Sequence, residues 1–345
     1  MVILDDDPDG DWTAPGVFRC APGVHRIPLP LPNDGLRAVN VYAVEDGDGI
    51  TLVDSGWALS EARDLLETAL KTLGAGFGDV RRFLVTHSHR DHYTQAVVLR
   101  HEFGMRVALG RGERSGLDII LSDRADGSAN QRRLARAGAH ELLSRLGAGP
   151  PPVDPTHWAP PDEWIDDGDE IVVGVGERLR RLRAVATPGH TRGHVVFADE
   201  AADLLFSGDH VLPRITPSIA LEPDPPANPL ADFLTSLELM RSRPDAAMLP
   251  AHGPVGMRVH ERVDELIAHH GVRLDASLAA VREGRRTASE VAAVLPWTRR
   301  GTALVDLDPF NAMLATLETA SHLEVLVQRD VLTRSEQDGV DHYSL

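Results

Sequence analysis

Apolar and polar positions in the first half of the chain follow strand and helix spacings in turn. Residues 58–73 place their apolar side chains on one helical face, which predicts an amphipathic helix packed on a sheet. Short β-rich runs lie on both sides of it. The predicted strands are 17–19, 39–44, 50–53, 82–86 and 107–109, with a hairpin turn at 46–49 and a second helix at 92–103. This alternation indicates an α/β fold.

The second half repeats the scheme more loosely and then becomes helical. Its predicted strands are 170–175, 182–186, 195–198, 204–207 and 247–250, with an amphipathic helix at 229–240. Between the halves, residues 113–161 combine a helical stretch at 131–146 with proline clusters, which indicates an insertion near a functional site. Helices are then predicted at 260–282, 288–295 and 310–330, followed by a small hairpin of 331–333 and 341–343.

We therefore expect two units, a catalytic domain of residues 1–256 and a C-terminal module of residues 257–345. A single hydrophobic core usually stops growing near ~250 to 300 residues, and the chain has 345. In the C-terminal module, Thr287 or Ser289 is the expected N-cap of the helix at 288–295.

Composition and charge narrow the location and the partners. Hydrophobic residues make up 42% and charged residues 25%, and no run approaches the roughly 18 apolar residues that a membrane span needs. The first eleven residues include five aspartates where a secretory signal would be basic, and Cys20 is the single cysteine. These features favour a cytoplasmic protein without membrane contact. The net charge of −17 repels phosphate backbones, so we expect a small-molecule substrate rather than nucleic acid.

The strongest chemical signal is the segment 86–92, which reads THSHRDH. In extended backbone His87 and His89 point to one side, while Asp91 and His92 open the next helix, whose N-terminus favours a carboxylate. Four possible metal ligands thus fall within six residues. With one cysteine, a metal would have to be bound by imidazole and carboxylate. The alternative is a polar loop with chance histidines.

Three later fragments each end a predicted strand on a further possible ligand. They are TPGH ending at His190, SGD ending at Asp209, and PAHG containing His252. Each fragment is weak by itself, because a lone histidine at a strand end is more often a surface or hydrogen-bonded residue. In this order, after the first cluster, they indicate a metal site.

The ordered motifs resemble those of the metallo-β-lactamase superfamily, which has an Asp after a strand, H-x-H-x-D-H, a strand-end His, a strand-end Asp and a final His. The first of these is Asp54, in the segment VDSG at 53–56, and the resemblance covers residues 17–256. It implies a four-layered αββα sandwich with metals at the sheet edge. The C-terminal module looks like the small winged-helix-like tail of some lactamase-like hydrolases. Because acids outnumber bases there, we favour packing or homodimer formation over DNA binding.

The resemblance also implies a role for each motif residue. One metal would be bound by His87, His89 and His190, the other by Asp91, His92 and His252, with Asp209 bridging them. Asp54 would orient a ligand imidazole, with a strand-ending turn residue as the alternative. His194, four residues after His190, resembles a family residue with a structural role.

Nitrogen and oxygen ligands suit two zinc ions, with iron or manganese as alternatives. Two such ions would lower the pKa of a bridging water toward ~7, so that the nucleophile is hydroxide. We take Asp91, Asp54, His210 and Tyr93 as catalytic candidates, the last two as possible contacts of substrate or a developing oxyanion. Packing or hydrogen bonding is the alternative for both. Arg214 could pair with a substrate anion or with a nearby aspartate.

The preferred function is hydrolysis of an ester-like bond, a thioester or a lactone, in the branch that resembles hydroxyacylglutathione hydrolases (glyoxalase II). The basic contacts expected for a glutathione thioester are missing from the C-terminal module, which leaves another acyl thioester open. The alternatives are a phosphodiester hydrolase resembling the lactamase-like endoribonucleases, a β-lactam hydrolase, a mononuclear iron dioxygenase, and a non-enzymatic scaffold. A fold does not by itself determine which of these applies.

Overall fold

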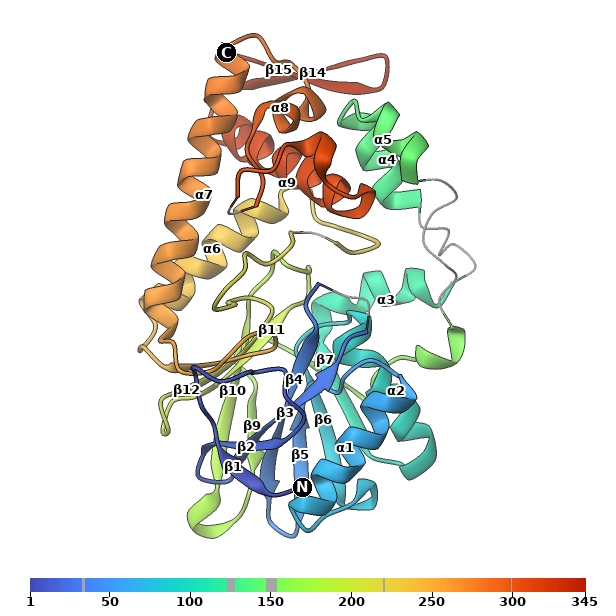
Figure 1. Ribbon diagram of the computed structural model, residues 1–345, viewed down its shortest axis with the longest axis vertical. Helices are drawn as coiled ribbons and strands as arrows, with labels where there is room; N and C mark the ends of the chain where they lie inside the picture. Colours follow the sequence, from blue (N-terminus) through green and yellow to red (C-terminus); the bar gives the residue numbers. More distant parts are fainter. Residues whose placement is uncertain (33–34, 123–127, 147–153, 220, 299) are drawn as a thin grey trace.

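The computed structural model describes residues 1–32, 35–122, 128–146, 154–219, 221–298 and 300–345, and its arrangement is shown in Figure 1. An eight-stranded sheet has its strands in chain order, and a five-stranded sheet runs in the order β13-β12-β11-β10-β9. The first sheet consists of β1 (Ile3–Asp5), β2 (Val17–Ala21), β3 (Val24–Pro30), β4 (Ala38–Asp46), β5 (Gly49–Val53), β6 (Val80–Val85), β7 (Arg106–Gly110) and β8 (Glu163–Ile165). The second consists of β9 (Glu170–Val173), β10 (Arg180–Ala186), β11 (Val195–Asp199), β12 (Leu204–Gly208) and β13 (Ala247–Pro250).

Three buried clusters show that the expected four-layered αββα sandwich forms. Side chains of β3 to β7 on one face pack with helices α1 (Ser60–Thr72) and α2 (Arg90–Phe103). The opposite face packs against the second sheet. The outer face of the second sheet packs with α6 (Pro229–Ser242) and α7 (Val259–Arg282). Alternation along β12 follows from strand geometry, since Leu204 and Phe206 lie between the sheets and Leu205 faces the helices.

Several elements differ from the sequence prediction. Strand β3 was not predicted, because its prolines Pro28 and Pro30 weaken a strand pattern. The single helix expected at 131–146 is two helices, α4 (Ser128–Arg136) and α5 (His140–Leu146). Gly138 separates them with a φ of +75°, a left-handed conformation that ends a helix. The proline run at 150–152 lies outside the described residues.

The C-terminal module consists of α7, α8 (Ala288–Val294), α9 (Pro309–Gln328) and a hairpin of β14 (Thr333–Gln337) and β15 (Val340–Ser344). Thr287, not Ser289, is the N-cap of α8, and it forms a capping box with Glu290. Helices α4 and α5 of the predicted insertion pack on α9 through Leu134 and Leu142, whereas α3 (Arg114–Ile120) packs near α2. The boundary at 256 and the winged-helix character of the module stay predictions.

Two buried histidines connect α7 to α9. The Nδ1 atom of His270 lies 3.1 Å from the Nε2 atom of His322. The Nδ1 of His322 donates to the backbone carbonyl of Glu318 at 2.8 Å, which leaves its Nε2 as an acceptor for His270. Within the described ranges, no helix is long and apolar enough to cross a membrane.

Candidate metal centre

Strand ends bring the candidate ligands together. Strands β5 and β6 are parallel neighbours, as are β12 and β13, so their carboxyl ends lie on the same edge of each sheet. Asp54 follows β5 directly, and Asp209 follows β12. The segment after β6 carries His87 and leads into α2. These local geometries place all seven predicted ligands in two groups: His87, His89, His190 and Asp209, and Asp91, His92 and His252.

In the first group three imidazole nitrogens face one another. The Nε2 of His87, the Nδ1 of His89 and the Nε2 of His190 lie 2.9 to 3.2 Å apart. The other ring nitrogens of two of them donate to carbonyls, from His89 to Leu221 at 2.8 Å and from His190 to Ser218 at 2.7 Å. Because a carbonyl can only accept, the inward nitrogens of these two rings carry lone pairs. Converging lone pairs are the arrangement that a cation stabilises.

The second group combines two imidazoles with carboxylates. The Nε2 of His252 lies 3.4 Å from oxygens of both Asp91 and Asp209, and the Nε2 of His92 lies 3.6 Å and 3.7 Å from the same two atoms. The outer nitrogen of His252 donates to the carbonyl of Ala38 at 2.7 Å. Both Nε2 atoms and Oδ1 of Asp209 are buried without a hydrogen-bond partner in the described chain.

Asp209 connects the two groups through its two carboxylate oxygens. Its Oδ1 faces His92 and His252, whereas its Oδ2 lies 3.4 Å from the Nε2 of His190. Orphaned buried polar atoms are costly, and each here faces a set of nitrogen and oxygen donors. The donor set therefore fits two divalent cations that share one carboxylate.

The electrostatics of the two groups differ. Burial lowers the pKa of His87 well below its usual value and that of His190 to about 3, so both are neutral and available as ligands. Burial also opposes charging of His92, but the carboxylates of Asp54, Asp91 and Asp209 raise its pKa to about 10. The second group therefore has an excess of negative charge and attracts a positive one.

Asp54 orients His92 of the second group through the ring nitrogen that faces away from the other ligands. Its backbone adopts a φ of +59°, and its carboxylate accepts from the backbone N–H of Thr86 at 2.8 Å. Its Oδ2 accepts from the Nδ1 of His92 at 3.0 Å, which turns the Nε2 of that ring inward. This is the contact that the sequence analysis expected of a carboxylate beside a ligand imidazole.

His194 positions Asp209. Its Nε2 accepts from the backbone N–H of Asp209 at 3.1 Å, and its Nδ1 lies 2.8 Å from the hydroxyl of Thr187. A side chain at Gly208 would place its Cβ 2.6 Å from that Nε2, and the residue has a φ of +50°. The close approach therefore requires glycine directly before Asp209.

The other catalytic candidates lie in packed surroundings. The Tyr93 hydroxyl donates to the carbonyl of Ala159 at 2.7 Å, so its only proton is already used. His210 is fully buried with its ring 5.2 Å from that of Phe233, and burial lowers its pKa to about 3. Arg214 is exposed. The contact of Tyr93 is the hydrogen-bonding alternative given for it in the sequence analysis, and the ring contact of His210 is the packing alternative.

Sequence reasoning missed residues that connect the ligand loops. Glu113 is buried and accepts hydrogen bonds from the hydroxyls of Ser88 and Thr191, one in each of two ligand segments. The side-chain amide of Asn40 donates to the carbonyls of Pro250 and Gly253 at 2.9 Å, on both sides of His252. A polar residue inside the apolar run of β4 was the available signal for Asn40, whereas a lone glutamate gave none for Glu113.

The model of the metallo-beta-lactamase superfamily matches residues 34–252. The chain belongs to this superfamily. It is 32% identical over 274 residues to a beta-lactamase-like protein 2 homolog of Caenorhabditis elegans, covering 78% of this chain and 76% of that protein. It is 25% identical over 310 residues to an atrochrysone carboxyl ACP thioesterase of Aspergillus novofumigatus, covering 86% and 78%. A beta-lactamase domain protein from Burkholderia ambifaria superposes with a TM-score of 0.82 at 30% identity, covering 98% and 97%.

Proposed function

We propose that the protein is a dinuclear zinc hydrolase that cleaves the thioester of a small acyl group, with a lactone as the related ester-like substrate. The observation that carries this proposal is the placement of Asp209, whose two oxygens face two separate groups of ligand atoms. A mononuclear iron site would need only one group. Nitrogen and oxygen donors without sulfur are compatible with zinc.

Zinc would be bound by the two groups described above, where it would lower the pKa of water and polarise a carbonyl oxygen. The chain contributes the alignment around it. Carbonyls of residues 218 and 221 hold two inward-facing imidazoles, Asp54 fixes the ring of His92, and His194 fixes the backbone of Asp209. Such alignment matters because ligands held rigidly need no rearrangement during the reaction.

A thioester is favoured by one relative and by the charge of the chain. The atrochrysone carboxyl ACP thioesterase shares the fold family and aligns with 86% of this chain. The net charge of −17 opposes binding of RNA, so phosphodiester cleavage is the weaker hypothesis. Thioesters and lactones both present a carbonyl to the same nucleophile.

The test is metal analysis of the purified protein together with a substrate panel of acyl-coenzyme A thioesters, lactones, a β-lactam and single-stranded RNA. We expect two zinc ions per chain and turnover of thioesters or lactones. Replacing His87 by Ala should lower turnover by about 1,000-fold or more, because the metal supplies several kcal/mol of transition-state stabilisation. The same replacement at His101, which is exposed on α2, is the matched control and should leave turnover unchanged. One iron per chain, or turnover of RNA or the β-lactam alone, would overturn the proposal.

A further inference from the structure

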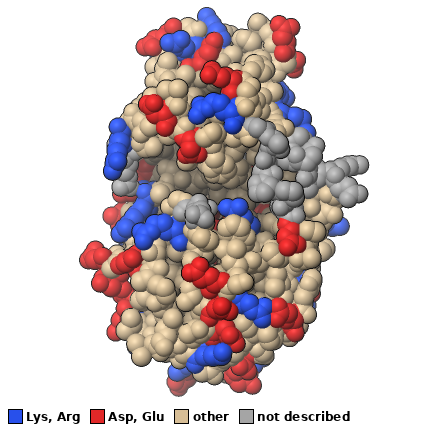
Figure 2. Space-filling view, turned by 45° about the vertical axis from the view of Figure 1, so that its right-hand side comes forward, with Lys and Arg blue, Asp and Glu red and all other residues tan. Residues whose placement is uncertain are grey.

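A cavity of about 320 Å³ lies between the loop that follows Asp209 and the C-terminal module. Its lining includes Ile219 and Leu221 from the loop and Trp297, Leu314 and Glu318 from the module. In Figure 2 the surface is hollowed between the upper part of the molecule, which holds this module, and the lower part, which holds the sheets. The volume is at the lower end of the range for small-molecule sites.

The cavity adjoins the metal centre through this loop. The carbonyls of Ser218 and Leu221 accept hydrogen bonds from His190 and His89, and both of these loop residues also line the cavity. One short segment thus borders the ligand groups and the cavity. The cavity lies directly beyond this segment, and none of its described lining residues belongs to the two ligand groups.

Glu318, on α9, is the unusual group in the lining. Its carboxylate has no hydrogen bond or ion pair within the part of the chain that the structure describes. Burial raises its pKa to about 6, although the positive charge of Arg273 opposes that rise. The carboxylate is therefore mostly ionised above neutral pH. A half-buried anionic acceptor beside apolar walls is stabilised by a ligand that donates a hydrogen bond to it.

The surroundings of Glu318 select the kind of donor. The positive charge of Arg273 acts on the carboxylate and opposes the entry of an ammonium group. Ring nitrogens of His269 and His270 lie within 4.8 Å of a carboxylate oxygen. A neutral hydroxyl carries no such penalty. Trp297 and Leu314 provide apolar area that suits an aromatic ring.

We propose that this cavity binds the acyl part of the substrate and that Glu318 selects acyl groups that are aromatic and carry a hydroxyl. The selection deepens the proposed thioesterase function and rests on it. Glu318 acts as a specificity-determining residue, which accepts the hydroxyl hydrogen while the reacting carbonyl lies at the ligand groups.

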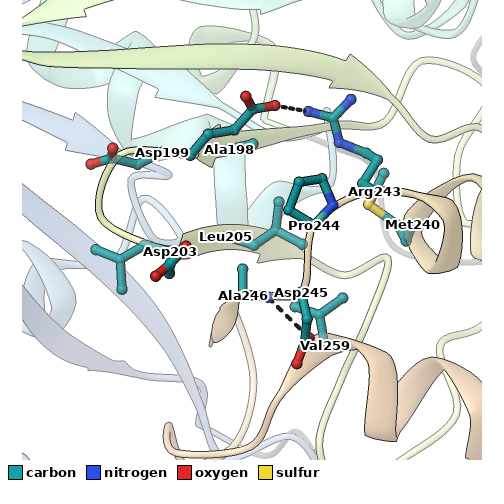
Figure 3. A pocket seen from close by; sticks show the side chains of 12 residues that line it. Ala198, Asp199, Asp203, Leu205, Met240, Arg243, Pro244, Asp245, Ala246 and Val259 are labelled. Carbon is teal, nitrogen blue, oxygen red and sulfur yellow. Dashed lines mark hydrogen bonds and ion pairs between the residues drawn. The ribbon is translucent and has the colours of Figure 1, made fainter.

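A second cavity offers no comparable recognition. It lies where β12 begins, the opposite end of this strand from Asp209, and has a volume of about 30 Å³ (Figure 3). Two of its charged side chains already have partners, since Arg243 donates to Glu200 at 2.5 Å and Asp245 accepts from the backbone of Ala246 at 2.9 Å.

The experiment compares two thioesters of coenzyme A, phenylacetyl and 4-hydroxyphenylacetyl, on the zinc-loaded full chain. The wild type should prefer the hydroxylated thioester in kcat/KM. Glu318→Gln should lower that preference by about 10-fold or more, since a hydrogen bond to a charged group contributes about 1.5 to 3 kcal/mol. Glu336→Gln, the same change at an exposed site on β14, should leave it unaltered. Leu314→Trp, which fills the cavity, should raise KM for both aromatic thioesters but not for acetyl-coenzyme A.

Three results would overturn the proposal. The first is an unchanged preference in Glu318→Gln. The second is a Leu314→Trp variant that handles aromatic and acetyl thioesters as the wild type does. The third is a third metal ion per chain that is lost in Glu318→Gln, because a ring nitrogen of both His269 and His270 lies within 4.8 Å of the carboxylate.

A binding measurement distinguishes failure of the proposed thioesterase function from failure of the proposed cavity specificity. If the wild type cleaves neither thioester, calorimetric titration with 4-hydroxyphenylacetamide and phenylacetamide still tests the cavity. A preference for the hydroxylated amide that disappears in Glu318→Gln would support hydroxyl recognition by the cavity while refuting thioester hydrolysis. Absence of that preference would overturn both.

Discussion

The buried pair His270 and His322 should make the free energy of unfolding depend on pH. Burial is the main cause that lowers the pKa of His322 to about 4, against an ordinary value of 6.5. Below pH 6.5 the unfolded chain binds a proton that the folded chain does not bind until about pH 4. The folded state is therefore fully stabilised above pH 6.5 and loses this contribution as the pH falls.

The size of the effect follows from the two pKa values. Each pKa unit corresponds to about 1.4 kcal/mol, so His322 contributes about 3 kcal/mol in full and about 2 kcal/mol between pH 7.5 and 5. Glu318 acts in the opposite direction, because burial raises its pKa to about 6 and the folded chain takes up its proton first. This opposing contribution is common to wild type and variant and largely cancels in their difference.

The perturbation is His322→Gln, whose amide oxygen can still accept from the Nδ1 of His270. Urea unfolding followed by circular dichroism at pH 7.5 and pH 5 gives the free energy of unfolding of each protein. Between these pH values the variant should lose about 2 kcal/mol less than the wild type. His101→Gln, at an exposed position, is the control and should behave as the wild type does. Equal losses in wild type and His322→Gln would refute the assignment of the pH dependence to this buried pair.

Three further substitutions test the metal centre and the packing around it. Asp54→Asn should weaken zinc binding by about 10- to 100-fold, because the ring of His92 loses the carboxylate that orients it. Competition with a chelator measures this affinity, and an unchanged value would contradict the role given to Asp54. Gly208→Ala should lower the free energy of unfolding by about 1 to 3 kcal/mol, because the new methyl group would collide with His194 and the residue has a positive φ. A variant with the melting temperature of the wild type would contradict this. Thr287→Ala should cost about 1 kcal/mol by removing the cap of α8, whereas Ser289→Ala should cost less in the same melting experiment.

Much of the fold was predictable because its signals are local. The buried strands β5, β6 and β12 are short apolar runs, the long helices show helical periodicity, and the five motif segments follow strand ends. The grouping of residues more than 100 positions apart, such as His87 and His190, came from the order of motifs that resembles the superfamily, because these two residues follow strands of different sheets. In the structure their Nε2 atoms lie 3.2 Å apart.

The remainder depended on contacts that one segment cannot reveal. Two prolines concealed β3, whose place in the sheet is set by pairing with β2 and β4. A single glycine divided the helix predicted at 131–146, and helices α4 and α5 pack on a helix that lies far along the chain. Glu113 and the loop carbonyls act through long-range hydrogen bonds, for which the sequence contains no spacing rule.

The use of main-chain oxygens to hold His89 and His190 has a consequence for divergence within the superfamily. Ser218 and Leu221 contribute their carbonyls, which every amino acid possesses, so mutation can replace either side chain without deleting the bond. The same side chains line the cavity beside the centre. Descendants of one ancestor can therefore acquire new substrate preferences by drift and selection at these positions while the inherited ligand geometry persists.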